Sequence, residues 1–431
     1  MRSTTHLIQG TNMTQKDDLI LSVKHLVVKF KTKTGVVNAV RDISFSIYRG
    51  EIVGLIGESG SGKSVTVKSI VRFNDNDTLS AQEIKLCGID LLKLTRSWFS
   101  FKKAKYNNTR RMKKVRGVYV AYIPQDPMTS LNPSMKVGKQ IYEAIKISQA
   151  RKYKIALNKL REDQRKGLGK GIDYNALIAK LKKEYKENTD PVHIKKRIFQ
   201  LLEFIGINDI ANNVNKYPNS FSGGMRQRIV IAITIACEPD LIIADEPTTA
   251  LDVIVQAKVI SLIKRLRDEL NISIMFISHN IALVANLCDY IYVMYAGKII
   301  EQGTLHDIFI EPRHPYTWAL IESIPDPQIK GDLAFIPGTP PNMTLPVHGD
   351  AFAPRNKYAL KIDFEKEPPL FKLSNTHKAA TWLVYDDAPK IPIPEGVKQK
   401  VEIARKAVWL KINGEDDNQT QEVPTTERDN K

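Results

Sequence analysis

The chain has 431 residues, of which 42% are apolar, and a formal net charge of +17; this length predicts a large core and more than one domain. It contains no run of about 18 apolar residues, so we expect no segment that spans a membrane, and its first 20 residues lack the apolar core of a secretory signal. The three cysteines, Cys87, Cys237 and Cys288, are too far apart for a metal-binding or disulfide pattern, so we expect buried thiols in a reducing cytosol.

The first element with chemical content is a phosphate-binding loop between a strand and a helix. Residues 52–56 form a short apolar run that predicts a buried strand, and residues 65–71 predict a helix. Residues 57–64 fit the pattern G-x-x-x-x-G-K-[ST], in which backbone N–H groups and the helix start surround an anion. We expect Lys63 to contact the β- and γ-phosphates and the Ser64 hydroxyl to bind Mg²⁺. The predicted ATP-binding residues of this loop are Gly57, Glu58, Ser59, Gly60, Ser61, Gly62, Lys63 and Ser64.

Two stretches beyond this loop are strongly basic. Residues 99–118 contain eight basic and no acidic side chains, and residues 151–187 contain twelve basic and five acidic ones. This charge could favour an anionic membrane leaflet or nucleic acid, but no aromatic pattern for base stacking accompanies the lysines. We therefore favour a solvated, lysine-rich surface, then the leaflet, and expect no direct binding of nucleic acid.

A second group of motifs follows at residues 221–246. The segment 221–227 reads Phe-Ser-Gly-Gly-Met-Arg-Gln, and an apolar run then leads into Asp245 and Glu246. Such a run suits a central parallel strand, and open α/β sheets bind ligands at the C-terminal ends of their strands. A carboxylate pair could also cap the next helix, but its position after a phosphate loop favours catalysis. A further apolar strand ends near His279, and an isolated His there would more often be structural.

This order of motifs resembles the ATP-binding-cassette family, in which the Ser-Gly-Gly turn of one subunit closes over ATP held by another. The resemblance implies an α/β fold: a P-loop ATPase core with an antiparallel β subdomain, an enlarged helical subdomain and a Pro-rich C-terminal extension. Asp252 lies in a segment similar to the loop that communicates across the dimer. Phe30 lies where an aromatic ring usually stacks on adenine, although a Phe in an apolar strand is often only core. The residues implied to contact ATP on the partner are Ser222, Gly223, Gly224 and Gln227.

The resemblance also implies how ATP is hydrolysed. Glu246 would polarise the attacking water, and Asp245 would hold the Mg²⁺ shell. Gln125 lies in a segment similar to the family's glutamine loop and would reach both the metal and the water. His279 would bind the γ-phosphate; the family usually has Asp at the next position, whereas this chain has Asn280, which puts a carboxylate contact there in doubt.

The C-terminal third narrows the resemblance to the peptide-importer ATPases. Residues 314–320 and 336–342 are similar to the tail of that branch, and the stretches 124–133 and 245–256 are typical of it. The Pro-Gly-Thr-Pro-Pro-Asn segment is more similar to the D-type than to the F-type ATPase of oligopeptide permease. The resemblance covers roughly residues 21–385, apart from the two insertions at about 97–116 and 148–190. It implies that the protein energises oligopeptide import from the cytoplasmic side of the cell membrane.

The resemblance implies several partners. They are a second, F-type ATPase subunit in a heterodimer, two transmembrane permease subunits and an extracellular or periplasmic-type peptide-binding protein. An importer of dipeptides, nickel or other small solutes is an alternative, because an ATPase subunit does not contact the substrate. A cassette ATPase that acts on nucleic acid is a remote alternative. Such proteins usually carry long coiled coils, zinc fingers or two cassettes, and this sequence contains none of these.

The tail departs from many relatives at the positions where they carry cysteines that can hold an iron–sulfur cluster. Asp350, Asn356, Asp363 and Thr381 occupy these positions here, and thiolates are the ligands of such clusters. We therefore predict no cluster. The tail must then keep its shape by apolar packing and proline stiffness, with a role in docking or dimer contact.

In chain order, the sequence predicts six regions. They are an N-terminal extension (1–20), a first part of the ATPase core with a basic insertion at about 97–116 (21–121), a helical subdomain with a charged insertion at about 148–190 (122–220), a second part of the ATPase core (221–300), a tail domain (301–390) and a polar, partly disordered end (391–431).

Overall fold

The computed structural model describes residues 18–33, 35–74, 77–95, 112–168, 171–249, 251–324 and 335–402. The start of the N-terminal extension, most of the predicted basic insertion and the polar end from residue 403 therefore lie outside the described residues. None of the helices in the described ranges combines the length and the apolar character needed to cross a membrane.

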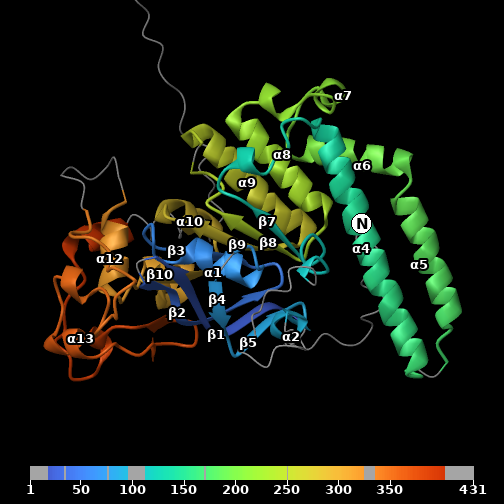
Figure 1. Ribbon diagram of the computed structural model, residues 1–431. Coiled ribbons are helices and arrows are strands. Elements are labelled where there is room, and N and C mark those ends of the chain that lie inside the picture. The colour runs from blue at the N-terminus through green and yellow to red at the C-terminus, as the bar shows by residue number, and fades with distance from the viewer. Residues whose placement is uncertain are drawn as a thin grey trace, which may run out of the picture.

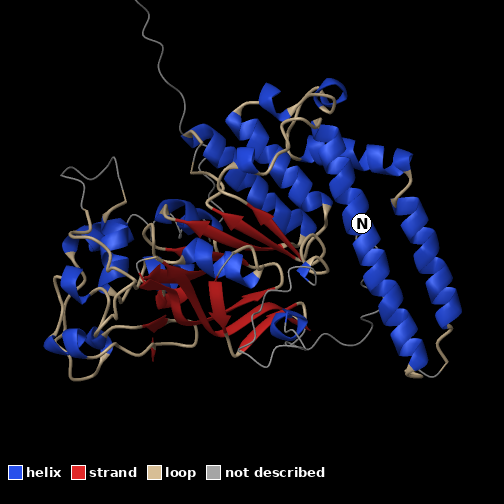
Figure 2. Cartoon of the chain, viewed as in Figure 1, coloured by secondary structure: helices blue, strands red, loops and turns tan. Residues whose placement is uncertain are grey.

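A central, mostly parallel sheet forms the middle layer of the molecule, between a second sheet and a group of helices (Figures 1 and 2). Its strand order is β12-β13-β11-β10-β3-β9-β8-β7, and the five strands from β10 to β7 pair in parallel. The strands are β3 (Ile52–Ile56), β7 (Val120–Ile123), β8 (Leu241–Asp245), β9 (Ser273–Ser278), β10 (Tyr290–Tyr295), β11 (Lys298–Thr304), β12 (Phe371–Lys372) and β13 (Lys378–Ala379).

The apolar runs of the central strands bury both faces of this sheet. In β3, Ile52 and Ile56 belong to the core on the helical side, whereas Val53 and Leu55 belong to the core on the opposite side. Successive side chains of a strand point to opposite faces, so a sheet covered on both faces requires a continuous apolar run. The strands β8 and β9 alternate in the same way.

The second sheet is antiparallel and covers one face of the central sheet. Its strand β1 pairs with β2, β4 and β5, and β6 lies beyond β5. The helix after the phosphate loop contributes Val67 and Ile70 to the apolar core on this side. The elements of this layer are β1 (Leu19–Thr32), β2 (Gly35–Tyr48), α1 (Lys63–Ile70), β4 (Asp77–Ser80), β5 (Glu83–Leu86), β6 (Ile89–Asp90) and α2 (Leu91–Thr95).

Helices from the middle of the chain cover the other face (Figure 1). Helices α4 (Val137–Arg165) and α5 (Tyr174–Asn188) form a long hairpin that extends beyond the sheets. The rings of Tyr153 and Tyr185 stack between them, with centroids 4.4 Å apart. The other helices of this layer are α6 (Pro191–Phe204), α7 (Ile210–Asn213), α8 (Gly223–Ala236), α9 (Val253–Leu270) and α10 (Ile281–Leu287).

The tail lies at the β11 edge of the central sheet and extends that sheet (Figure 1). Its short hairpin of β12 and β13 joins the sheet where Glu301 and Gln302 of β11 pair with residues of β13. Its helices are α11 (Leu305–Phe309), α12 (Pro315–Glu322) and α13 (Lys361–Glu365). Because the hairpin shares backbone hydrogen bonds with β11, the tail is attached to the central sheet along a strand.

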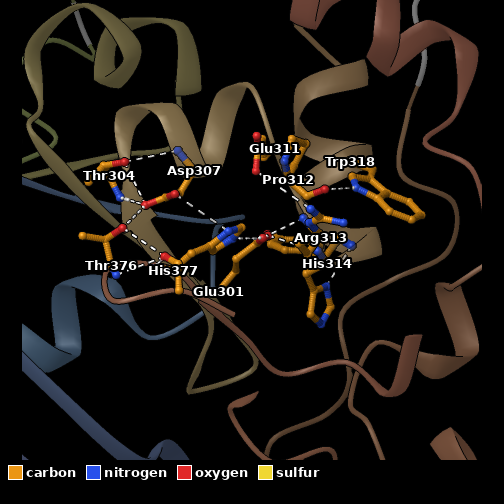
Figure 3. A network of polar contacts seen from close by, with 12 residues as sticks. Glu301, Thr304, Asp307, Glu311, Pro312, Arg313, His314, Trp318, Thr376 and His377 are labelled. Atoms are coloured by element: carbon orange, nitrogen blue, oxygen red, sulfur yellow. Dashed lines mark hydrogen bonds and ion pairs between the residues drawn. The ribbon is translucent and has the colours of Figure 1, made fainter. Parts of the chain in front are cut away.

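A buried ionic network fastens this hairpin to β11 (Figure 3). Glu301 is fully buried; its carboxylate accepts hydrogen bonds from the backbone N–H groups of Arg313 (2.7 Å) and His314 (3.2 Å). His377 Nε2 lies 2.8 Å from Glu301 Oε1, and His377 Nδ1 lies 4.0 Å from Asp307 Oδ1. A buried carboxylate is stable only when its oxygens are paired, so Glu301 joins β11, the segment before α12 and the β12–β13 hairpin.

We expect Glu301→Gln to destabilise the attachment of the tail. The substitution removes a buried charge and turns one acceptor into a donor that faces other N–H groups, and breaking a buried pair typically costs about 3–5 kcal/mol. Thermal unfolding of the full chain measures the loss, and limited proteolysis locates it. Glu311→Gln is the matched control, because Glu311 is half exposed and its nitrogen partner on Arg313 is 3.9 Å away. Equal unfolding midpoints for the two variants would contradict the role of Glu301.

Candidate functional site

The candidate site lies where the parallel strands end. The phosphate loop follows β3, Asp245 is the last residue of β8, His279 follows β9 and Gln125 follows β7. Parallel strands place their C-terminal ends at one edge of the sheet, which is where open α/β sheets bind ligands. The structure therefore brings to one edge the predicted residues that are far apart in the sequence.

The glycines of the phosphate loop allow a backbone that other residues rarely adopt. Gly57, Gly60 and Gly62 have φ angles of 149°, 81° and 102°. A Cβ atom on Gly57 would lie 2.1 Å from the carbonyl oxygen of Met294, and one on Gly62 would lie 2.5 Å from that of Ala39. The loop is thus pressed against the end of β10 and against β2, so a side chain at Gly57 or Gly62 would displace it.

The phosphate loop has an exposed part, Ser59 and Gly60, which we call its crown, and a buried part around Ser61, which we call its base. Ser59 and Gly60 are exposed, whereas Ser61 is buried. The Ser61 hydroxyl lies 3.4 Å from Lys63 Nζ, and the Ser61 carbonyl accepts a hydrogen bond from the N–H of Gly297 at 2.9 Å. A phosphate could therefore approach the crown without rearrangement of the base.

Lys63 is folded back into the loop. Its Nζ donates to the carbonyl oxygens of Gly57 (2.7 Å) and Glu58 (2.8 Å). Burial lowers the pKa of Lys63, against the opposing attraction of Glu246, Asp245 and Glu58. An anion in the loop would offer this ammonium stronger, charge-assisted hydrogen bonds than the carbonyls do.

Asp245 is the centre of a buried polar cluster. Its side chain accepts hydrogen bonds from Ser64 Oγ on Oδ1 and from Tyr122 OH on Oδ2, both at 2.6 Å, and Lys68 Nζ lies 3.5 Å from Oδ2. Asp245 is only 2% exposed. The carboxylate and the Ser64 hydroxyl are hard oxygen ligands of the kind that Mg²⁺ prefers, so this donor set fits the ion.

The carboxylate of Glu246 lies in a second cluster. Its Oε2 accepts hydrogen bonds from Gln125 Nε2 (3.1 Å) and Thr249 Oγ1 (3.0 Å), and it lies 3.2 Å from His279 Nδ1. The backbone of Glu246 has a φ of 49°, a left-handed conformation that costs a non-glycine residue about 1–3 kcal/mol. Such conformations often occur at functional sites, although Glu246 is one of nine non-glycine residues with a positive φ in the described ranges. Its carboxylate lies within contact distance of Gln125 and His279.

Tyr122, Lys68 and Thr249 join these clusters although none was predicted as a site residue. Tyr122 is the penultimate residue of the apolar segment that becomes strand β7, next to β8, so its place near Asp245 could be inferred from the sequence. Lys68 lies four residues after Ser64, on the same face of α1. Thr249 lies three residues after Glu246, within reach of a tight turn.

The Ser-Gly-Gly segment begins helix α8 and packs against α9. Ser222 is the exposed N-cap of α8, where its hydroxyl accepts a backbone N–H of the first turn at 3.4 Å. A Cβ atom on Gly223 would meet nothing, whereas one on Gly224 would lie 2.3 Å from Val255 Cγ1. Gln227 is buried. Within the described ranges, none of these four predicted residues hydrogen-bonds with the phosphate loop.

Asp252 and Asn280 are both helix caps. Asp252 Oδ1 accepts a hydrogen bond from the N–H of Val255 at 2.9 Å, at the start of α9. Asn280 Oδ1 accepts the N–H groups of Ala282 (3.0 Å) and Leu283 (3.3 Å), at the start of α10. Asn caps helices about as well as Asp. Compared with the Asp that the resemblance leads one to expect, Asn280 therefore keeps the helix cap and lacks only the negative charge.

Phe30 is part of the apolar core. It lies in β1, opposite Val37 of β2 and Asp77 of β4. Its ring is partly buried and packs against the core between the two sheets. The structure thus gives Phe30 a packing role, and its stacking on adenine stays a prediction.

The four tail positions that the resemblance associates with cysteine ligands carry oxygen atoms that accept backbone hydrogen bonds. The pairs are Asp350 with the N–H of Phe352 (3.0 Å), Asn356 with that of Tyr358 (2.9 Å), Asp363 with that of Leu360 (2.6 Å) and Thr381 with that of Leu383 (3.3 Å). These side chains do not fit a thiolate-bound iron–sulfur cluster. No group of three or more His, Cys, Asp or Glu in the described part of the chain is placed to hold a metal ion.

Comparison with known proteins identifies both parts of the chain. Residues 40–249 match the family model described as ABC transporter, and residues 300–362 match that described as oligopeptide/dipeptide transporter, C-terminal region. The oligopeptide transport ATP-binding protein OppD of Mycoplasma genitalium is 50% identical, over 92% of this chain and 96% of the relative. The protein of that name from Bacillus subtilis is 44% identical, over 89% and 94%. The dipeptide transport ATP-binding protein DppD of Lactococcus lactis is 40% identical, over 93% and 99%.

We expect the stability of the tail to depend on pH through Asp350. Burial raises the pKa of this carboxyl group from 3.8 to about 6, so the folded chain binds the proton more tightly than the unfolded chain. The resulting stabilisation is complete below pH 3.8 and is lost as the pH rises through about 6. Thermal scans from about pH 5 to about pH 7 should therefore show a falling midpoint.

The variant Asp350→Asn should flatten this dependence, because Asn keeps an acceptor for the N–H of Phe352 but does not titrate. The matched control is Asp387→Asn, which changes an exposed carboxyl group of the tail. If Asp350→Asn showed the same slope with pH as the wild type, the assignment to Asp350 would be wrong.

Proposed function

The chain belongs to the ATP-binding subunits of oligopeptide ABC transporters, and we propose on this basis that it hydrolyses ATP to energise the import of oligopeptides. One observation carries the proposal: Gln125 and His279 both contact the carboxylate of Glu246, beside the Ser64–Asp245 pair that follows the phosphate loop. The substrate class is supported by the relatives named for oligopeptide transport.

The proposed roles follow from the contacts of each side chain. The loop N–H groups and Lys63 hold the β- and γ-phosphates. Glu246 orients the attacking water, with its carboxylate held in place by Gln125, Thr249 and His279. His279 contacts the γ-phosphate. Phosphoryl transfer depends mainly on positioning and on neutralisation of charge, and these residues supply both.

Ser64 and Asp245 would hold Mg²⁺, and Gln125 lies next to this pair through its contact with Glu246. When bound, the ion would supply positive charge that offsets the negative charge of the phosphates. The chain contributes the two oxygen ligands side by side, and Tyr122 and Lys68 keep the Asp245 carboxylate in position.

The segment of Ser222, Gly223, Gly224 and Gln227 is proposed to complete the ATP site of a second subunit. Ser222 is exposed and Gly223 has open space around it. Both lie at the N-terminus of α8, where the helix dipole and free N–H groups favour an anion. We propose that the second subunit is an F-type ATPase and that Asp252 acts in communication between the two.

The proposed partners at the membrane are two permease subunits. The segment 124–133 follows β7 and begins beside the cluster around Glu246, which Gln125 contacts. It also contains Met128, a large apolar residue that is 41% exposed. This loop could therefore report the state of Glu246 to a permease. The protein would then lie on the cytoplasmic side of the membrane, with a peptide-binding protein delivering the substrate from outside.

We expect Glu246→Gln to abolish ATP turnover in the assembled transporter while ATP binding persists. The loss should be about 100-fold or more, which is typical for removal of a group that acts on the transferred proton or the water. Phosphate release and peptide uptake in proteoliposomes measure it. Glu269→Gln, in an exposed pair with Arg265 on α9, is the control. Turnover equal to that of the control would contradict the assignment of Glu246 as the residue that orients the attacking water.

Purification of the tagged chain in mild detergent tests the partners and the substrate. We expect a second ATPase subunit and two permease subunits in the complex. Peptide uptake competed by oligopeptides rather than by dipeptides supports the oligopeptide assignment. One observation supports the dipeptide alternative, namely the 40% identity to a dipeptide transport protein. Preferential competition by dipeptides would establish this alternative.

A further inference from the structure

The tail contacts the phosphate loop directly at Glu58. Arg355 donates two hydrogen bonds to the Glu58 carboxylate, from Nη1 to Oε2 at 2.6 Å and from Nη2 to Oε1 at 3.0 Å. The backbone N–H of Glu58 donates to the hydroxyl of Tyr316, on α12, at 2.7 Å. A bidentate pair between Arg and a carboxylate fixes both distance and orientation. The tail therefore holds Glu58 at its carboxylate, through Arg355, and at its backbone N–H, through Tyr316.

Both tail residues are themselves held in place. Arg355 is 8% exposed; its Nε donates to the carbonyl of Pro337 at 2.7 Å, and its Nη1 donates to Tyr295 OH at 3.1 Å. The ring of Tyr316 is fully buried and packs against Tyr295 and Phe352, with centroids 4.7 and 5.3 Å away. Both side chains are thus anchored within the tail, and a shift of the tail would shift the groups that hold Glu58.

The charge of Glu58 explains why such a contact matters for ATP. Its carbonyl oxygen accepts a hydrogen bond from Lys63 Nζ, so the residue belongs to the framework of the phosphate loop. An unpaired carboxylate at this point would repel a triphosphate. Arg355 offsets this charge, and it does so from outside the loop, without occupying the crown formed by Ser59 and Gly60.

We propose that Arg355 and Tyr316 are positioning residues for the phosphate loop, so that the tail sets the affinity of this chain for ATP. This inference rests on the proposed function, because it requires that the loop binds ATP. The tail is then a part of the nucleotide site, and a partner that shifts the tail changes ATP affinity through Glu58.

The test is the dissociation constant for ATP, measured by calorimetry on the purified full chain. Arg355→Met leaves the Glu58 carboxylate unpaired near the phosphates and should weaken ATP binding about tenfold or more. Tyr316→Phe removes one hydrogen bond and should weaken binding about threefold to tenfold. Arg355→Lys keeps the charge but not the two-pronged hydrogen bond, so its affinity should lie between those of Arg355→Met and the wild type.

The decisive variant combines Arg355→Met with Glu58→Gln. Because the uncompensated charge is then absent, ATP affinity should return to within about threefold of that of Glu58→Gln alone. A purely structural role of Arg355 within the tail predicts no such rescue by a substitution in the loop. Arg313→Met is the matched control, since it removes a half-exposed arginine of the tail and should leave ATP affinity unchanged.

The outcomes separate this inference from the proposed function. If the wild type fails to bind ATP, or if Lys63→Ala binds it equally well, the proposed function fails. If Lys63→Ala loses binding but Arg355→Met binds like the wild type, or the double variant is as weak as Arg355→Met, the positioning role is overturned. Should Arg355→Met not fold, Tyr316→Phe decides, and an affinity equal to that of the wild type overturns the role.

Discussion

The parallel pairing of five strands, in the order β10-β3-β9-β8-β7, makes the site possible. All five run in the same direction, so their C-terminal ends meet at one edge of the sheet. The strand β8 lies between β9 and β7, which places Glu246 between His279 and Gln125. A different strand order would separate these side chains, whatever the sequence of each strand.

Two adjacent carboxylates at the end of β8, those of Asp245 and Glu246, have different environments. Asp245 is buried and accepts hydrogen bonds from Ser64 and Tyr122, which suits a metal ligand. Glu246 leaves the strand with a left-handed backbone, which directs its carboxylate to Gln125 and His279. The two neighbouring carboxylates can therefore have different proposed roles, one in holding an ion and the other in orienting water.

The tail is built into the ATPase core by several independent contacts. A hairpin extends the central sheet at β11, Glu301 ties that hairpin to the segment before α12, and Arg355 and Tyr316 hold Glu58 of the phosphate loop. Oxygen atoms of Asp350, Asn356, Asp363 and Thr381, at the positions that the resemblance associates with cysteine ligands, accept local backbone hydrogen bonds. These contacts attach the tail to the core, and the pairing of Arg355 and Tyr316 with Glu58 is the basis of its proposed effect on ATP binding.

Glycine spacing and apolar runs in the sequence predict the phosphate loop and the buried strands, because they constrain the nearby backbone. The set of Gln125, Glu246 and His279 was predicted from the resemblance to the ATP-binding-cassette family, and the strand order brings these three side chains into contact. The sequence indicates where Tyr122 and Lys68 lie in their strand and helix, but their contacts with Asp245 depend on the pairing of β7 with β8 and on the position of α1. The contact of Arg355 with Glu58 joins residues 297 positions apart. Such a contact depends on how the tail packs against the sheet, and no pattern of neighbouring residues encodes that packing.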